Sequence, residues 1–309
     1  MTVLSRNFAL IFVGMAGIFW ASSGVAVQDF FAHSTKTAME LTNIRMCLSG
    51  AILIIISARR KNFRLSLGLL NYRPRLWLDV VIYGVIGVMF MQFTYFQAIS
   101  IGGAAATTVI TYACPAMVVL WESFYHKRLP KRGEVVAVIL AMSGVFLLVT
   151  GGNPTKMIVP LGCVFWSLAS GAAFAFSAIF PKHLFAKKID PYFLTGVGMF
   201  IGGLSTFALI EDRNWLPFTA TPEILFDVSW IIIFGTVAAF LSFNAGLRFL
   251  TPEEASITAT TEPAASVIIS WAVFGTAFGF VESIGIVLVM LAIVAPTIIS
   301  PKAKRPSRP

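Results

Sequence analysis

The chain has 309 residues and a formal net charge of +9, but only 12% of its residues are charged and its mean hydropathy is +0.84. Soluble domains carry about one quarter charged residues, whereas the apolar residues here gather in blocks of about 20, the length that crosses a bilayer. The basic residues lie between these blocks, so the composition excludes a soluble nucleic-acid-binding protein and indicates an integral membrane protein.

Ten apolar segments are long enough to cross a bilayer, and we expect an all-α protein with ten transmembrane helices. One basic residue, Arg6, precedes the first segment, and no clear cleavage site follows it, which favours a retained helix over a cleaved signal peptide. The segments lie at about 8–27, 41–58, 76–98, 103–125, 133–150, 158–180, 191–210, 227–247, 253–274 and 281–299.

The basic residues are distributed unequally between alternate links. If both ends of the chain lie in the cytoplasm, 19 lysine and arginine residues fall on the cytoplasmic side and 3 on the outer side, with Arg45 inside the second segment. Cytoplasmic links of membrane proteins are enriched in lysine and arginine. The distribution therefore supports ten crossings with both termini in the cytoplasm.

The second half of the sequence repeats the first at an offset of 148 residues. Residues 107–122 match 255–270, with Pro115 at the position of Pro263. A fixed offset indicates an internal repeat. Because each half has five crossings, the second half runs in the opposite sense, as in many secondary transporters. We expect inverted five-helix repeats at 1–150 and 151–300 and a basic cytoplasmic tail at 301–309.

These features together resemble the EamA family of the drug/metabolite transporter superfamily over essentially the whole chain. Each half has a tryptophan in its first helix, a proline in its fourth and a glutamate at the start of its fifth. The matching residues are Trp20, Trp166, Cys114, Pro115, Glu262, Pro263, Glu134 and Glu282. The resemblance implies a central cavity lined by the first, third, fourth, sixth, eighth and ninth helices, with the fifth and tenth at the periphery. It also implies export of amino acids or other small metabolites, while the wider superfamily includes sugar-nucleotide carriers.

Glu262 lies near the bilayer midplane, about nine residues into the ninth segment at about 1.5 Å per residue. A carboxylate at that depth costs at least about 2.5 kcal/mol and is rare without a partner or a role. Burial favours the neutral form of a carboxyl group, so one interpretation is a proton-coupling or substrate-amine site. The alternative is a structural glutamate that binds backbone groups freed by Pro263. The first half has Cys114 at the matching position, so the halves differ here.

Hydroxyl-bearing residues recur on one face of the fourth segment and on the matching face of the ninth. Steps of three and four residues place side chains on one helix face, and a polar face inside a membrane contacts protein or water, not lipid. We interpret both faces as cavity walls, with hydroxyl bonds between helices as the alternative. Glu262 lies off this face, about 160° from Thr260 at about 100° per residue. The faces are Thr108, Tyr112, Pro115, Val119, Glu122, and Ser256, Thr260, Pro263, Val267, Ser270.

Trp20 and Trp166 lie in mid-segment, away from the membrane interfaces where tryptophan concentrates. Each is either an aromatic wall of the cavity or a packing residue. For Arg45, near the outer end of its segment, the sequence favours a side chain that extends to the outer surface, with contact to a substrate carboxylate as the alternative. Weaker polar candidates are Gln92, Tyr95, Gln97 and Asn244.

Three further features have structural interpretations. Gly198 and Gly202 allow close helix approach, either within the chain or in a dimer. Glu122 and His126 are expected to form a charge network at the headgroup level, with a gate as the alternative. Cys47, Cys114 and Cys163 lack paired spacing and are interpreted as packing residues, not as disulfide or metal ligands.

The sequence therefore predicts a secondary transporter that exports small metabolites such as amino acids across the plasma membrane by alternating access. Glu262 is the expected proton-coupling residue. The expected substrate-binding residues are Trp20, Tyr112, Trp166, Thr260, Thr108 and Ser256. Because no ATP-binding, metal-protease or membrane-hydrolase motif occurs, we expect no enzyme activity, cofactor or metal. The alternatives are a sugar-nucleotide-type exchanger or facilitator and a non-transporting scaffold subunit, and both monomer and homodimer stay open.

Overall fold

The computed structural model describes residues 3–114, 116–117, 119, 123, 127, 129–210, 221–247, 249–250, 254, 258 and 260–299. Within these residues every regular element is helical, as the sequence predicts. The first half contains α1 (Val3–His33), α2 (Ala38–Ala58), α3 (Lys61–Tyr72), α4 (Arg75–Ile82), η1 (Tyr83–Met89), α5 (Phe90–Gly102) and α6 (Ala104–Thr111). The second half contains α8 (Arg132–Thr150), α9 (Leu161–Ile179), α10 (Lys182–Ala186), α11 (Pro191–Thr206), η2 (Phe207–Leu209), α12 (Pro222–Ile232), η3 (Ile233–Ala238), α13 (Ala239–Leu247), α15 (Thr261–Phe274) and α16 (Phe280–Ile299).

Eight of the ten predicted segments contain a helix that is long enough and apolar enough to cross a membrane. The fourth and ninth segments differ from the rest. The fourth contains α6 with 8 residues, and the ninth contains α15 with 14, while other residues of both segments lie outside the described ranges. A total of ten crossings therefore stays a prediction, and so does the cytoplasmic tail at 301–309.

The third crossing helix of each half has a π-helical centre. In the first half η1 joins α4 to α5, and in the second half η3 joins α12 to α13. π-Helical segments are rare and often lie at functional sites, because they displace backbone groups from the regular helical ladder. Both segments contain glycine, Gly84 in η1 and Gly235 in η3. The structural repeat thus extends to this irregularity, which the sequence analysis did not predict.

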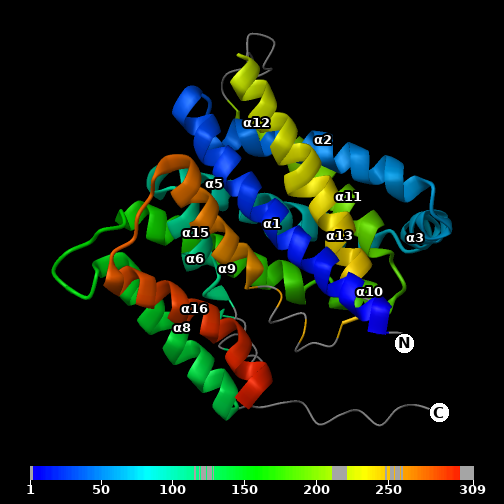
Figure 1. Ribbon diagram of the computed structural model, residues 1–309. Helices are drawn as coiled ribbons and strands as arrows, with labels where there is room; N and C mark the ends of the chain where they lie inside the picture. The colour runs from blue at the N-terminus through cyan, green and yellow to red at the C-terminus, as the bar shows by residue number, and fades with distance from the viewer. Residues whose placement is uncertain are drawn as a thin grey trace.

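The helices α8 and α16 pack against each other at the edge of the bundle (Figure 1). They cross at Gly144 and Gly285, where a Cβ added to either glycine would lie 2.6 Å from the carbonyl oxygen of the other. Only glycine permits this backbone approach. These are the fifth and tenth predicted helices, which the family resemblance places at the periphery.

Gly198 and Gly202 on α11 contribute to packing inside the chain. Gly198 lies against the ring of Tyr83, and a Cβ added to Gly202 would lie 2.6 Å from the carbonyl oxygen of Gly84. The glycine face of α11 is therefore covered by η1. This contact confirms the interpretation of the two glycines as a packing motif within the chain.

The first helix connects the two halves. It packs against α12, η3, α13 and α15, and Figure 1 shows α1 between α15 and the helix formed by α12 and α13. A Cβ added to Gly17 would lie 3.1 Å from the backbone nitrogen of Glu262. The absence of a side chain at Gly17 thus brings α1 directly against the start of α15.

The helix α3 was not predicted. The basic stretch that includes Arg59, Arg64 and Arg73 lies between the predicted segments 41–58 and 76–98. The structure forms a 12-residue helix there, with Leu70 and Ser66 buried against the bundle. Its apolar residues recur at helical spacing, so periodicity was the signal that could have identified it.

Candidate functional site

The candidate site lies where two short helices of the repeat meet. The helix α6 ends at Thr111 and is followed by the turn residues Tyr112 and Ala113, while α15 starts at Thr261 after the turn residue Thr260. At the offset of 148, Tyr112 corresponds to Thr260, so the two interruptions fall at equivalent positions. Interrupted helices in paired halves mark the binding sites of many transporters, because their ends leave backbone groups for a solute or an ion.

Tyr112 joins the two interruptions. Its hydroxyl group donates a hydrogen bond of 2.6 Å to Oε2 of Glu262, which lies in the first turn of α15. A carboxylate in the first turn is favoured by the partial positive charge at a helix N-terminus. The bond spans 150 residues of sequence and connects the first half to the second.

A cavity of about 520 Å³, called the central cavity below, lies beside this junction. Its wall combines aromatic rings with polar groups. The aromatic residues are Trp20, Tyr95, Tyr112, Phe174, Phe240 and Phe243. The polar residues are Ser23, Arg45, Gln92, Thr111, Ser170, Glu262 and Thr297. Cavities of this size and lining hold small organic molecules.

Arg45 points into the protein, and the sequence-based preference for an outward side chain is wrong. It is 4% exposed and lines the central cavity. Its Nε donates to Oγ1 of Thr236 at 2.9 Å, its Nη2 donates to the carbonyl oxygen of Gly235 at 3.0 Å, and its guanidinium lies 5.2 Å from the centre of the Phe96 ring. The π-helical segment η3 thus supplies both hydrogen-bond partners, 190 and 191 residues away in the sequence.

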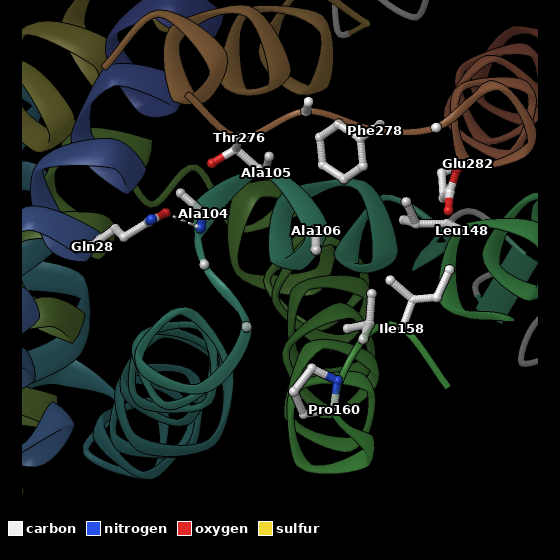
Figure 2. Close-up of a pocket in the computed structure, with 15 residues that line it drawn as sticks. Gln28, Ala104, Ala105, Ala106, Leu148, Ile158, Pro160, Thr276, Phe278 and Glu282 are labelled. Carbon is white, nitrogen blue, oxygen red and sulfur yellow. Dashed lines mark hydrogen bonds between the residues drawn. The ribbon is translucent and has the colours of Figure 1, made fainter. Parts of the chain in front are cut away.

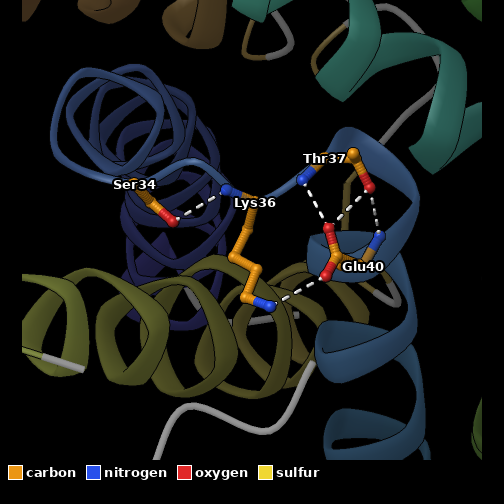
Figure 3. Close-up of polar contacts among 4 residues, drawn as sticks. All are labelled: Ser34, Lys36, Thr37 and Glu40. Carbon is orange, nitrogen blue, oxygen red and sulfur yellow. Dashed lines mark hydrogen bonds and ion pairs between the residues drawn. The ribbon is translucent and has the colours of Figure 1, made fainter. Parts of the chain in front are cut away.

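The start of α2 is fixed by a polar cap about two turns before Arg45. Figure 3 shows Glu40 accepting bonds from the backbone nitrogen and hydroxyl group of Thr37, at 2.7 and 2.9 Å, while Nζ of Lys36 lies 3.1 Å from its Oε1. Lys36 also donates its backbone N–H to Ser34 at 3.1 Å. This capping box orders the first turn of the helix that carries Arg45.

Glu262 and Arg45 place opposite charges on one cavity. The two groups interact electrostatically, but no ion pair within 4.0 Å joins them in the part of the chain that the structure describes. Glu262 is partly accessible, whereas Arg45 is almost fully buried. A solute in the cavity can therefore contact an anion from the second half and a cation from the first.

A hydroxyl network supports the cavity wall. The hydroxyl groups of Tyr95 and Thr108 form a hydrogen bond of 2.7 Å, and Ser266 donates to Thr108 at 3.2 Å. Thr108 is fully buried behind Tyr95 and does not line the cavity itself. For Thr108 the structure favours hydroxyl bonding between helices over direct exposure to the cavity.

The remaining predicted site residues lie in different environments. Trp20 lines the cavity and packs edge-on against Phe240, with ring centroids 5.7 Å apart. Trp166 does not line it, since its ring packs 5.7 Å from Phe93 and belongs to the core around α6. Thr260 is not among the lining residues, and Ser256 lies outside the described residues.

The weaker polar candidates and the remaining singled-out residues fall into three groups: some line the cavity, some do not, and some lie outside the described residues. Gln92 and Tyr95 line the cavity, whereas Gln97 does not. The side chain of Asn244 is not among those that the structure describes. Pro115, Glu122 and His126 also lie outside the described residues. Cys114 lines the cavity.

The cavity wall also contains residues that the sequence did not single out. All six helices implied by the resemblance contribute, but α2 also contributes through Arg45, and the end of α16 contributes Ile293, Pro296 and Thr297. Phe240 and Phe243 share one face of α13 because they are three residues apart. Their spacing was visible, but an aromatic pair in an apolar helix has no signal of its own.

A second hollow of about 310 Å³ lies at the opposite end of α6 (Figure 2). Oε1 of Gln28 accepts a hydrogen bond of 2.7 Å from the backbone nitrogen of Ala104, and Figure 2 shows Glu282 on the far side of the hollow. It shares no lining residue with the central cavity. The Gln28 bond satisfies the first backbone donor of α6 and attaches this helix to α1.

Comparisons with known proteins agree with this architecture. The model of the EamA-like transporter family matches residues 7–150 and again residues 161–296. An uncharacterized inner membrane transporter, YicL of Salmonella typhimurium (strain LT2), is 27% identical over 290 residues, which cover 94% of this chain and 95% of that protein. The uncharacterized transporter YwfM of Bacillus subtilis (strain 168) is 23% identical over 294 residues, 94% of each chain. A solved crystal structure with 16% identity has a TM-score of 0.65 and covers 97% of this chain and 100% of its own.

Proposed function

Because the chain belongs to the EamA-like transporter family, we propose that it exports small zwitterionic metabolites such as amino acids across the plasma membrane, in exchange for protons. The two matched repeats and the named relatives make it a multi-pass membrane transporter. Substrate, direction, coupling, membrane and orientation are the proposed part. In this proposal both termini are cytoplasmic, and the inverted halves at 1–150 and 151–300 alternate access to the central cavity.

The observation that carries this proposal is the pair of opposite charges on the central cavity. The hydrogen bonds that hold Arg45 use Nε and Nη2, and a guanidinium has five N–H groups. Nη1 can therefore donate to a substrate carboxylate in the planar geometry that arginine favours. Glu262, on the other half, can accept a bond from a substrate ammonium group. A zwitterion satisfies both residues at once.

The size and chemistry of the wall fit a small substrate with an apolar side chain. A cavity of about 520 Å³ lies within the range of about 300–1,000 Å³ that is usual for small-molecule sites. Trp20, Phe240 and Phe243 form one aromatic cluster on its wall. Aromatic rings bury large apolar areas, so the cavity favours amino acids with apolar side chains over strongly charged ones.

Competition at Glu262 supplies the proposed coupling. The carboxylate that accepts the substrate ammonium group is the same group that would accept a proton. Protonation removes the negative charge that binds the ammonium group, so the proton and the substrate compete for Glu262. Proton binding then releases the substrate, and substrate binding releases the proton, which is the reciprocal linkage required for exchange. An inwardly directed proton gradient would therefore drive the substrate outward.

The two alternatives are less well supported. A sugar nucleotide carries a doubly charged phosphate, but Arg45 is the single lysine or arginine among the described residues that line the cavity, and Glu262 would repel the anion. A non-transporting scaffold subunit would not need a charged central cavity. Family membership also favours transport over a scaffold role.

A panel of labelled amino acids and other small metabolites, each loaded into proteoliposomes, tests the proposal. The vesicles are those in which the outer face of the protein points to the external medium. In them we expect substrate-specific efflux of apolar amino acids that becomes faster when the external medium is made more acidic than the lumen. Specific efflux without a pH response would remove the proton role. Efflux of sugar nucleotides but not of amino acids would contradict the proposed substrate class.

A further inference from the structure

The short helix α3 is fixed to the bundle through one face. The backbone N–H of Asp190 donates to Oγ of Ser66 at 3.0 Å, and Nδ2 of Asn62 donates to Oδ2 of Asp190 at 3.4 Å. Leu70, on the same side of α3, is fully buried. Figure 1 shows α3 beyond the end of α2, at the edge of the bundle. The inward face of α3 is therefore already bound by the protein.

The outward face of α3 carries large apolar side chains without protein cover. Leu65 is 69% exposed and Tyr72 is 81% exposed. They are seven residues apart, so they lie on one face, two turns from each other. That face is opposite Leu70, which follows Leu65 by five residues, about 140° around the helix. The helix thus has two apolar faces, one buried in the bundle and one open.

Basic residues surround this open face. Between Arg59 and Leu78 the sequence has six lysine and arginine residues and no aspartate or glutamate. Arg59, Arg64, Arg73 and Arg75 are exposed. Arg60 differs, since its guanidinium stacks 4.1 Å from the centre of the Tyr192 ring. Among the described residues no ion pair joins Arg59, Arg64, Arg73 or Arg75 to an acid, so the charge of these exposed arginines is available to a ligand.

We propose that α3 and its flanking arginines form a binding site for the headgroups of anionic phospholipids. An amphipathic helix with an apolar stripe and basic edges lies in the boundary between headgroups and acyl chains. Leu65 and Tyr72 would enter the acyl boundary, while Arg64, Arg73 and Arg75 would contact lipid phosphates. Clusters of lysine and arginine next to a membrane helix attract anionic lipids in the same way.

The charge pattern selects this occupant. The protein is surrounded by lipid wherever it functions, and an apolar stripe flanked by arginines matches both parts of an anionic phospholipid. A zwitterionic lipid would use the apolar stripe but not the excess positive charge. The site lies outside the central cavity and shares no residue with it, so the inference does not depend on the proposed substrate.

Lipid retention by the full-length protein, measured by native mass spectrometry, tests this proposal. The detergent-purified protein is incubated with phosphatidylglycerol or phosphatidylcholine of the same acyl composition. We expect the parent protein to retain phosphatidylglycerol in preference to phosphatidylcholine. In the triple variant Arg64→Gln, Arg73→Gln, Arg75→Gln, retention of phosphatidylglycerol should fall about tenfold or more, because each of the three arginines contributes to the attraction for the lipid phosphate.

Two controls distinguish a built site from a general effect of charge. The variant Arg132→Gln with Lys156→Gln and Lys188→Gln also removes three positive charges, but from exposed positions outside α3, and it should retain phosphatidylglycerol as the parent does. Glycerol phosphate, the soluble headgroup, should not compete, because it lacks the acyl chains that Leu65 and Tyr72 contact.

Three results would overturn the proposal. They are equal retention of both lipids by the parent, equal loss in the two triple variants, and full retention after loss of Arg64, Arg73 and Arg75. A variant Leu65→Ser, Tyr72→Ser keeps all arginines and should also weaken retention. The substituted side chains are exposed, so we expect unchanged thermal unfolding temperatures in all variants.

Discussion

Replacing Glu262 with glutamine should abolish the response of transport to an imposed pH gradient. Glutamine has nearly the same shape as glutamate and keeps an oxygen that accepts the Tyr112 hydrogen bond. Its amide group does not bind or release a proton near neutral pH. A gradient of one pH unit coupled to one proton supports about tenfold accumulation of substrate. The Glu262→Gln protein should show no gradient-driven accumulation, measured as labelled substrate in proteoliposomes with the gradient present or collapsed.

The matched control is Glu223→Gln, which changes the same residue type at an exposed position in the first turn of α12. This variant should keep the pH response of the parent. If Glu262→Gln also accumulated substrate with the parent's dependence on the gradient, the assignment of proton coupling to Glu262 would be wrong. Loss of coupling in both variants would indicate a general effect of charge and would equally count against the assignment.

Replacing Arg45 with glutamine should remove recognition of the substrate carboxylate. Loss of one partner of a buried charged contact costs about 2–5 kcal/mol, so kcat/KM for an amino acid should fall by about 30-fold or more. The corresponding amine, which lacks the carboxylate, should be transported by the variant at nearly the parent's rate. Initial rates of efflux for the two substrates, measured in the same preparation, give this comparison directly.

Transport of the amine also distinguishes loss of carboxylate recognition from misfolding of the Arg45→Gln variant. Arg45 binds Gly235 and Thr236, so its removal leaves buried partners without a donor. If the variant lost amino acid and amine transport equally, Arg45 would be a structural residue and the zwitterion proposal would fail. Arg132→Gln, an exposed substitution at the start of α8, should leave transport of both substrates unchanged.

The sequence predicted the helical class and the repeat because these depend on composition and spacing, and the resemblance of the matched motif residues predicted the family. The same offset that matches Pro115 to Pro263 also locates the equivalent interruptions at Tyr112 and Thr260. Counting residues along a segment gives an expected depth in the membrane for Glu262 and Arg45, and that depth stays a prediction. Both side chains line the central cavity, but their functions stay predictions.

The direction of a side chain about its helix axis was harder to predict than the position of the helix in the sequence. The angle of about 160° between Thr260 and Glu262 assumes one continuous helix at about 100° per residue, yet Thr260 is a turn residue before α15 begins. The two side chains therefore do not compete for one face. Arg45 was misassigned for a related reason, since its partners in η3 are about 190 residues away and no local pattern shows them.

Repeat symmetry also predicts position better than environment. Trp20 and Trp166 occupy corresponding first helices, but Trp20 lines the cavity beside Phe240, whereas Trp166 packs against Phe93 in the core. The repeat places each tryptophan in a corresponding helix, and the neighbouring side chains, which differ between the halves, decide what each tryptophan contacts.

The most direct test of exchange between substrate and protons is the movement of protons caused by substrate alone. Proteoliposomes that contain the parent protein and an internal pH-sensitive dye start without a pH gradient, and an apolar amino acid is added outside. Amino acid that enters the lumen should drive protons out, so the lumen becomes more alkaline, and Glu262→Gln should abolish this change. Uptake of the amino acid without any change in internal pH would contradict exchange of substrate and proton at one carboxylate.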